Sequence, residues 1–289
     1  MNLIRNLPGP LLIFLGALSL SFGGLIVKSF EGATLWQILF WRSLFFSLTI
    51  LAFLIISYRS KTLKSFYESG LPGFVGGIIL SFGFCGYVFA MYNTTVANTN
   101  FIISLQILFL AIFGYFFLKE KINLITLISI ILAMSGVLLM VGNSLTPGEL
   151  SGNLAAFTMP ITFAVLIMIV RKYPSVDMVP AQFVAGISSC LIGFLLSSNI
   201  MISSHDIFLG FLAGFFQVGF GFIFITIGAR TTPSAMVGII MLSESILGPI
   251  WAFLFASEIP SMFGLIGGSI ILLAVLLQFY HLKRENNYK

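Results

Sequence analysis

The sequence predicts an all-α integral membrane protein with ten transmembrane helices, arranged as two inverted five-helix repeats. Three observations predict this fold: the composition, the alternation of positive charge along the chain, and a weak internal repeat. Of the 289 residues, 58% are hydrophobic and 8% are charged, and the mean hydropathy is +1.10. Soluble domains carry about 25% charged residues. The composition therefore excludes a cytosolic enzyme, a secreted disulfide scaffold and a disordered chain.

Apolar runs of about 20 residues, the length of a helix that crosses the hydrocarbon core, predict the individual spans. The breaks between the runs hold charged or turn-forming residues, such as Thr231-Thr232-Pro233. The predicted spans are residues 11–28, 33–57, 71–92, 95–118, 122–142, 152–170, 177–198, 207–229, 234–256 and 260–281.

Lys and Arg residues gather in every second link between the predicted spans. Of the 14, one (Lys28) falls on one side of the predicted membrane and Arg42 falls inside a span. The other twelve share the side of the two termini: Arg5, Arg59, Lys61, Lys64, Lys119, Lys121, Arg171, Lys172, Arg230, Lys283, Arg284 and Lys289. Because cytoplasmic loops are enriched in Lys and Arg, we expect both termini to be cytoplasmic, in a bacterial cytoplasmic (inner) membrane.

The chain matches itself weakly at an offset of 138 residues. Between residues 94 and 139, 11 of 46 positions recur, against roughly four expected by chance. Glu120 recurs as Glu258, just after the fourth predicted helix of each half, and Gln106 corresponds to Glu244. The offset predicts two repeats, residues 1–146 and 147–289. Because five is odd, the second repeat is inverted, an architecture typical of secondary transporters.

Three polar side chains lie near the middle of predicted spans: Arg42, Gln106 and Glu244. A charge in the bilayer core costs at least about 2.5–3.5 kcal/mol and normally faces a cavity or a partner. One hypothesis makes these residues a substrate-binding site, in which Glu244 binds a cation or a proton. The alternative is a structural Arg42–Glu244 ion pair. Trp41 and Tyr87 are candidates for an aromatic lining of the same site, or for membrane-interface positions.

Other site types find no support in the sequence. Cys85 and Cys190 lie in apolar runs without metal-ligand spacing, so we predict no metal, cofactor or disulfide. No Walker motif is present, and the basic loops lack the aromatic residues of nucleic-acid sites. Three pairs of glycines are expected to pack helices within one chain, which favours a monomer or a weak homodimer. These pairs are Gly73/Gly77, Gly210/Gly214 and Gly264/Gly268.

Three stretches carry a family resemblance. They are Ser21-Phe22-Gly23-Gly24 through Lys28 with Phe40-Trp41-Arg42-Ser43, then Ala97 through Leu118-Lys119-Glu120-Lys121, and lastly Thr232-Pro233-Ser234-Ala235 through Glu244, Pro249 and Ala256-Ser257-Glu258. With them the chain resembles the EamA-type ten-helix permeases of the drug/metabolite transporter superfamily, over nearly its whole length. It departs from that pattern at Ser21 and Phe22, where a Trp is usual, and in the five-residue separation of Glu244 from Pro249.

The resemblance implies a secondary transporter, an exporter or exchanger of a small polar metabolite such as an amino acid. Such a protein works by alternating access around a midplane cavity, with membrane lipid as its surroundings. A proton is a candidate coupling ion, because burial and the charge of Arg42 act in opposite directions on the proton affinity of Glu244. The alternatives are an intramembrane enzyme and a non-transporting membrane scaffold. His205 and His281 stand at span ends without the neighbours that catalytic motifs require.

Overall fold

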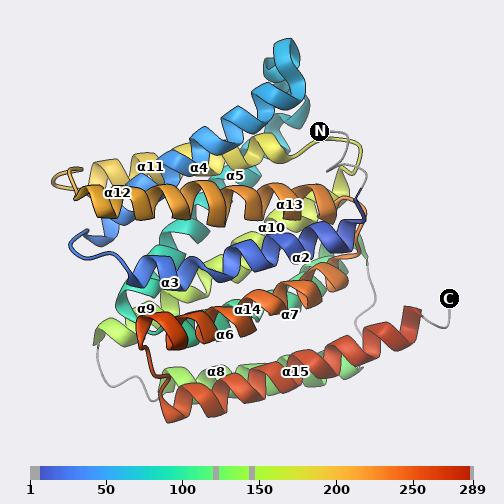
Figure 1. Cartoon of the computed structure of the whole chain (residues 1–289). Helices are drawn as coiled ribbons and strands as arrows, with labels where there is room; N and C mark the ends of the chain where they lie inside the picture. Colours follow the sequence, from blue (N-terminus) through green and yellow to red (C-terminus); the bar gives the residue numbers. More distant parts are fainter. Residues whose placement is uncertain (1–6, 120–123, 143–146, 287–289) are drawn as a thin grey trace.

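The computed structural model describes residues 7–119, 124–142 and 147–286, and these residues form helices joined by short links, without a strand (Figure 1). Seven helical stretches are long and apolar enough to cross a membrane. One of them, Leu35–Asn93, contains two of the predicted spans. Two shorter apolar helical stretches, Leu127–Gly136 and Met262–Ala274, fall in two further predicted spans. Arg5, Glu120, Lys121 and Lys289 lie outside the described residues.

The helices follow the predicted runs, several of them in two pieces. In the first half they are α2 (Gly9–Ser21), α3 (Gly23–Lys28), α4 (Leu35–Tyr58), η1 (Arg59–Lys61), α5 (Thr62–Asn93), α6 (Val96–Ile103), α7 (Gln106–Leu118) and α8 (Leu124–Gly142). In the second half they are α9 (Pro147–Ala156), α10 (Thr158–Lys172), α11 (Val179–Leu196), α12 (Ser204–Phe211), η2 (Leu212–Phe220), α13 (Gly221–Ala229), α14 (Ser234–Ala256) and α15 (Met262–Asn286).

The helix at the start of each half is interrupted. The first breaks at Phe22, between α2 and α3, and its counterpart breaks at Phe157, between α9 and α10. Pro160 lies in the first turn after the second break and has no N–H to continue the helical hydrogen bonds. A third break separates α6 from α7, and η2 is a nine-residue π-helix between α12 and α13. Interrupted helices inside a membrane are tolerated where the freed backbone meets protein or a cavity.

Helix α5 begins at Thr62, earlier than the predicted span 71–92, and a kink at Gly70 separates the additional segment from that span. Gly70 adopts a left-handed φ of 53°, and Pro72 follows two residues later. A non-glycine residue rarely adopts that φ, so Gly70 allows the chain to turn there. The helical segment before the kink carries Lys64 and Glu68, which form an exposed ion pair with a 3.6 Å separation.

The helices of the two halves interlock. Helix α4 packs on α11, α2 on α13 and α14, and α10 on α5 and α7. Helices α8 and α15 pack on each other and lie side by side along one flank of the bundle (Figure 1). Their contact is close, since a Cβ at Gly136 would lie 2.6 Å from the carbonyl oxygen of Gly267.

The three glycine pairs face helices of the same chain. Gly77 faces α11, where a Cβ would lie 2.5 Å from the carbonyl oxygen of Ala181. Gly214 faces α4, where a Cβ would collide with the carbonyl oxygen of Arg42. Gly268 faces α6, where a Cβ would collide with the Phe101 ring. These contacts agree with the expectation of intramolecular packing through small residues.

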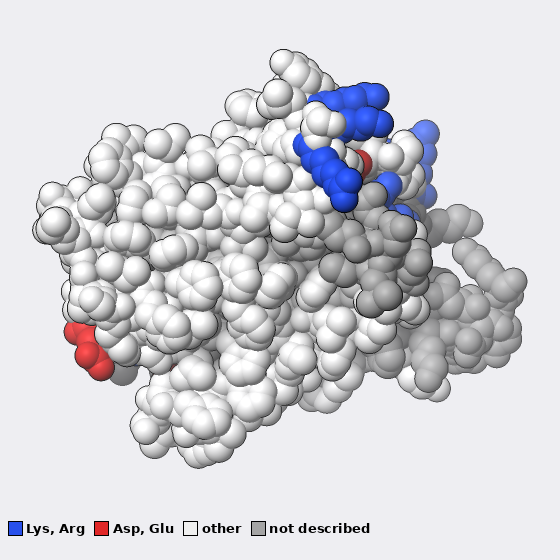
Figure 2. Space-filling view, turned by 45° about the horizontal axis from the view of Figure 1, so that its top comes forward, with Lys and Arg blue, Asp and Glu red and all other residues white. Residues whose placement is uncertain are grey.

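The bundle has two chemically different ends. Lys and Arg side chains gather at one end, here named the basic end (Figure 2). There Arg230 donates to the carbonyl oxygen of Pro174, and Arg171 donates to Ser234 Oγ. The opposite end is held by a different set of polar contacts: Lys28 with Glu258, Glu31 and Gly32 with Asp206, and Gln37 with Asn199 and Met201.

Candidate functional site

Arg42 is a buried cation on α4. Its side chain is 3% exposed, and its guanidinium carbon lies 5.3 Å from the ring centre of Phe84 and 5.1 Å from that of Tyr87, both on α5. Cation–π attraction to two rings offsets part of the cost of burying the charge. Among the residues that the structure describes, Arg42 Nε has no hydrogen-bond partner. The cation is therefore held mainly by aromatic faces.

Glu244 brings the opposite charge from α14 and is 5% exposed. It interacts electrostatically with Arg42 and with Tyr87, so the three side chains share one buried region. Within the described parts of the chain, no ion pair or hydrogen bond joins Arg42 to Glu244. Two opposite charges thus lie in the same region without direct contact.

Gly23 explains how the hydroxyl of Tyr87 fits against the broken first helix. A Cβ at position 23 would collide with Tyr87 Oη and would lie 2.7 Å from Gln217 Nε2. A residue without a side chain is needed where groups approach the backbone this closely. Gly23 opens α3 directly after the break at Phe22. The break therefore lies beside the region of Arg42 and Glu244.

Gln217 belongs to this neighbourhood, although the sequence analysis did not single it out. It lies on η2, is 1% exposed, and donates through Nε2 to the carbonyl oxygen of Leu20 at 3.2 Å. The sequence did carry a signal, because Gln217 is an isolated amide in an apolar run, as Gln106 is. Its contact with the first helix follows from the tertiary packing, which the run alone does not reveal.

An aromatic pair lies beside the same break. Phe22 stacks on Trp251 of α14, with ring centres 5.2 Å apart and planes at 7°. The indole N–H of Trp251 donates to Ser21 Oγ at 3.0 Å. Trp251 follows Glu244 by seven residues, which is two helical turns, so both lie on the same face of α14. This face combines a carboxylate with a flat aromatic surface.

The two remaining predicted site residues, Gln106 and Trp41, make no hydrogen bond or ring contact with Tyr87 or Glu244 within the part of the chain that the structure describes. Gln106 is 1% exposed at the start of α7, and its Nε2 has no partner among the described residues. The indole of Trp41 donates to the carbonyl oxygen of Ile200 at 2.8 Å, in the link that follows α11. Trp41 also packs against Gly210 of α12. The structure brings Arg42, Tyr87 and Glu244 together, and no hydrogen bond in the described chain adds Gln106 or Trp41 to them.

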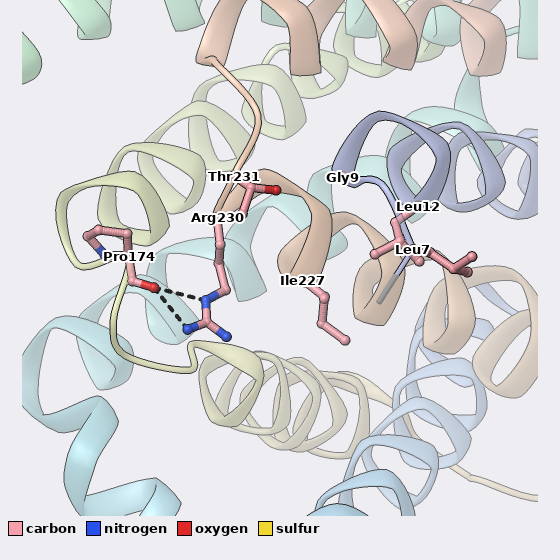
Figure 3. Close-up of a pocket in the computed structure, with 7 residues that line it drawn as sticks. All are labelled: Leu7, Gly9, Leu12, Pro174, Ile227, Arg230 and Thr231. Atoms are coloured by element: carbon pink, nitrogen blue, oxygen red, sulfur yellow. Dashed lines mark hydrogen bonds between the residues drawn. The ribbon is translucent and has the colours of Figure 1, made fainter. Parts of the chain in front are cut away.

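A pocket lies elsewhere, at the basic end. Figure 3 shows residues that line it, at the start of α2 and the end of α13. Its volume is about 270 Å³. Its walls include Leu12, Ile227 and Arg230, whose guanidinium is fastened to the carbonyl oxygen of Pro174 by two hydrogen bonds. The pocket contains none of the predicted site residues. Within the described chain no three His, Cys, Asp or Glu side chains gather as metal ligands would.

Comparison with known proteins identifies a family, a relative and a similar structure. The model of the EamA-like transporter family matches twice, over residues 7–142 and 146–280. A protein of Methanothermobacter thermautotrophicus named as an uncharacterized transporter is 26% identical over 205 residues, which is 65% of this chain and 58% of that protein. A crystal structure of another protein has the same fold, with a TM-score of 0.68 at 16% identity, covering 96% of this chain and 98% of that one. With two matches that together span most of its length, the chain is a membrane protein that belongs to the EamA-like transporter family.

Proposed function

We propose that the protein is a secondary transporter of a small zwitterionic metabolite, such as an amino acid or a related compound. The observation that carries this proposal is the arrangement of Arg42 and Glu244, which are both buried, interact electrostatically and make no direct contact. A carboxylate of the substrate would bind Arg42 and an ammonium group would bind Glu244. The ligand would then form a charge-assisted pair with each of the two side chains.

The neighbouring rings fit the same substrate class. Phe84 and Tyr87 lie under Arg42, and the Phe22–Trp251 stack follows Glu244 along α14. A small amphipathic molecule could place its charged end between Arg42 and Glu244 and its apolar part against these rings. Sites for small molecules commonly combine apolar walls with a few polar groups that fix orientation.

The packing of the helices supports alternating access. Numbered by predicted span, the first span packs on the eighth and ninth, and the sixth packs on the third and fourth. The second packs on the seventh and the fifth on the tenth. Exchanging the two halves, by adding five to each number, turns this set of pairs into itself. Two equivalent halves can exchange conformations, and each exchange would close one end of a central cavity and open the other.

The proposal includes ten spans with both termini in the cytoplasm, in a cytoplasmic membrane. The basic end would then face the cytoplasm. Export or exchange is the expected direction of transport, with a monomer or a weak homodimer as the working unit. The alternatives are an intramembrane enzyme and a non-transporting membrane scaffold, and the two matches to a transporter family favour a transporter over both.

Counterflow into liposomes tests the proposal. Purified protein is reconstituted into vesicles loaded with one unlabelled L-amino acid, and uptake of the labelled amino acid is measured for each of the twenty. We expect one or more to accumulate, and Glu244→Gln to abolish the accumulation while the protein still elutes as a folded species in detergent. If the wild-type protein carries no amino acid, the proposed substrate class is wrong. If Glu244→Gln transports normally, the proposed site is wrong.

A further inference from the structure

The orientation of the Gln217 side-chain amide is fixed. Its Nε2 donates to the carbonyl oxygen of Leu20, which also accepts the backbone N–H of Phe22 at the end of α2. If the amide were flipped, its oxygen would face that carbonyl oxygen and repel it. The Gln217 amide oxygen, Oε1, therefore points away from Leu20.

This oxygen is an unmatched acceptor. Gln217 is 1% exposed, and Oε1 has no hydrogen-bond partner among the described residues. Most buried polar atoms have a partner, and a buried acceptor without one is unfavourable. A donor from a bound molecule would remove that penalty. The side chain therefore offers an acceptor to a hydrogen-bond donor of a bound molecule.

The Gln217 side chain lies beside the proposed site. Gln217 Nε2 and the Tyr87 hydroxyl both lie close to Gly23, where a Cβ would collide with them. The ring of Tyr87 lies under Arg42. Three residues before Gln217, Gly214 packs against the backbone of Arg42. The π-helical turn between them leaves the carbonyl oxygen of Phe216 to accept from Ser19 Oγ at 2.6 Å. Such π-helical turns occur frequently at functional sites.

We propose that Gln217 determines substrate specificity, by accepting a hydrogen bond from a hydroxyl or amide group on the side chain of the transported zwitterion. The proposal rests on the proposed function and narrows its substrate class to amino acids, or related compounds, with a neutral side-chain donor. A binding site built around a buried acceptor discriminates strongly against an analogue that lacks the donor, because the acceptor is then left unpaired.

Three pairs of amino acids of similar shape test this inference: serine with alanine, threonine with valine, and asparagine with leucine. For each member, the initial rate of transport into liposomes is measured over a range of concentrations. We expect the wild-type protein to favour the donor-bearing member by about tenfold or more in Vmax/KM in at least one pair. This first measurement needs no variant. A ratio near one in every pair that is carried overturns the inference.

The variant Gln217→Met keeps the length of the side chain and removes the acceptor. We expect it to lose the preference, mainly because the donor-bearing amino acid is carried less well. The matched control is Gln182→Met, because Gln182 is also fully buried, donates through Nε2 to Thr226 and has an Oε1 without a partner in the described chain, but belongs to α11. A merely structural effect would lower both rates and leave their ratio unchanged.

The possible failures can be told apart. If the wild-type protein carries no amino acid, the proposed function fails, and the assignment of Gln217 fails with it. If it carries amino acids and Glu244→Gln stops them, but Gln217→Met keeps the wild-type ratio, only the assignment of Gln217 is wrong. If Gln182→Met removes the preference as completely as Gln217→Met does, the effect is not specific to Gln217 and the inference is also wrong.

Discussion

Lys28 Nζ and Glu258 Oε2 lie 3.7 Å apart at the end of the bundle opposite to the basic end. Lys28 also donates to the carbonyl oxygen of Thr94 at 2.9 Å, and Glu258 accepts the backbone N–H of Val96 at 2.5 Å. These contacts therefore tie the end of α3 and the junction of α5 and α6, which belong to the first half, to Glu258, two residues after the end of α14 in the second half. They hold elements of both halves together at that end.

Glu258→Gln should make the opposite end open more often, because the ion pair and a charge-assisted hydrogen bond are weakened together. Cys85 is a native reporter, since it lies on α5 two residues before Tyr87, whose ring lies under Arg42. In a Cys190→Ser background, we expect a membrane-impermeant maleimide added at the opposite end to modify Cys85 roughly two- to fivefold faster. The gain is modest because the pair is partly exposed.

Glu68→Gln is the control for that experiment, because it removes an ion pair of similar length from the exposed segment before Gly70. We expect it to leave the modification rate unchanged. Equal rates in wild type, Glu258→Gln and Lys28→Met would show that the contact does not restrict access from its end.

Gly214→Ala should destabilise the protein. A Cβ there would collide with the carbonyl oxygen of Arg42 and would lie 2.7 Å from Phe46 N, and backbone atoms of α4 cannot move aside cheaply. Overpacking of this kind costs about 1–3 kcal/mol. We expect a lower midpoint of thermal unfolding, measured by the fraction of monodisperse protein that remains after heating.

Gly32→Ala is the matched control, because a Cβ at position 32 would meet no atom within 4 Å. Its unfolding midpoint should equal that of the wild-type protein. If the two variants unfold at the same temperature, the close approach of η2 to α4 does not limit stability.

The double variant Arg42→Met, Glu244→Leu separates the binding hypothesis from the structural ion pair. Each single replacement leaves a buried charge without its counterpart and should lower stability, whereas the double replacement removes both charges and should recover it. Because a zwitterion would then have no charged partner, we expect transport to stay absent. Counterflow and thermal unfolding of the four proteins measure both quantities. Transport restored in the double variant would contradict the binding hypothesis.

Reporter fusions test the orientation. Because 12 of the 14 Lys and Arg residues map to one side of the predicted membrane, a fusion after residue 289 should report the cytoplasm. A fusion after residue 150 should report the other compartment, because an odd number of spans precedes it. The same compartment for both fusions would contradict the inverted repeat.

The ends of several spans could be predicted from the sequence, because charged or turn-forming residues flank them. The predicted span 234–256 coincides with α14, between Pro233 and Ser257, and the predicted span 33–57 differs from α4 by two residues at most. The family resemblance was also confirmed by the two matches of the family model. Span boundaries and family motifs depend on neighbouring residues in the chain, so they can be read from the sequence alone.

The interruptions inside the helices were harder to predict from the sequence. Gly23 and Gly24 follow Phe22 directly, but glycine also occurs inside membrane-spanning helices, so the pair alone does not predict the end of α2 there. The apolar run of η2 does not reveal that the carbonyl oxygen of Phe216 accepts from Ser19 Oγ, 197 residues earlier. The shared region of Arg42 and Glu244 was expected from their similar predicted depth, whereas Tyr87 was a candidate only because of its aromatic ring. The assignment of Gln106 and Trp41 to the same site stays a prediction, because depth does not reveal which face of a helix points to which neighbour.

The packing of α2 on α13 and α14 has a consequence for synthesis of the chain. Ser19 donates a hydrogen bond to the carbonyl oxygen of Phe216, which lies 197 residues later in the chain. At about 5–20 residues per second, the ribosome adds Phe216 roughly 10–40 s after it adds Ser19. During that interval α2 must persist in lipid without its native neighbours. The hydroxyl of Ser21 donates to the carbonyl oxygen of Leu18 within the same helix, so this polar group has a hydrogen-bond partner before the second half of the chain is made.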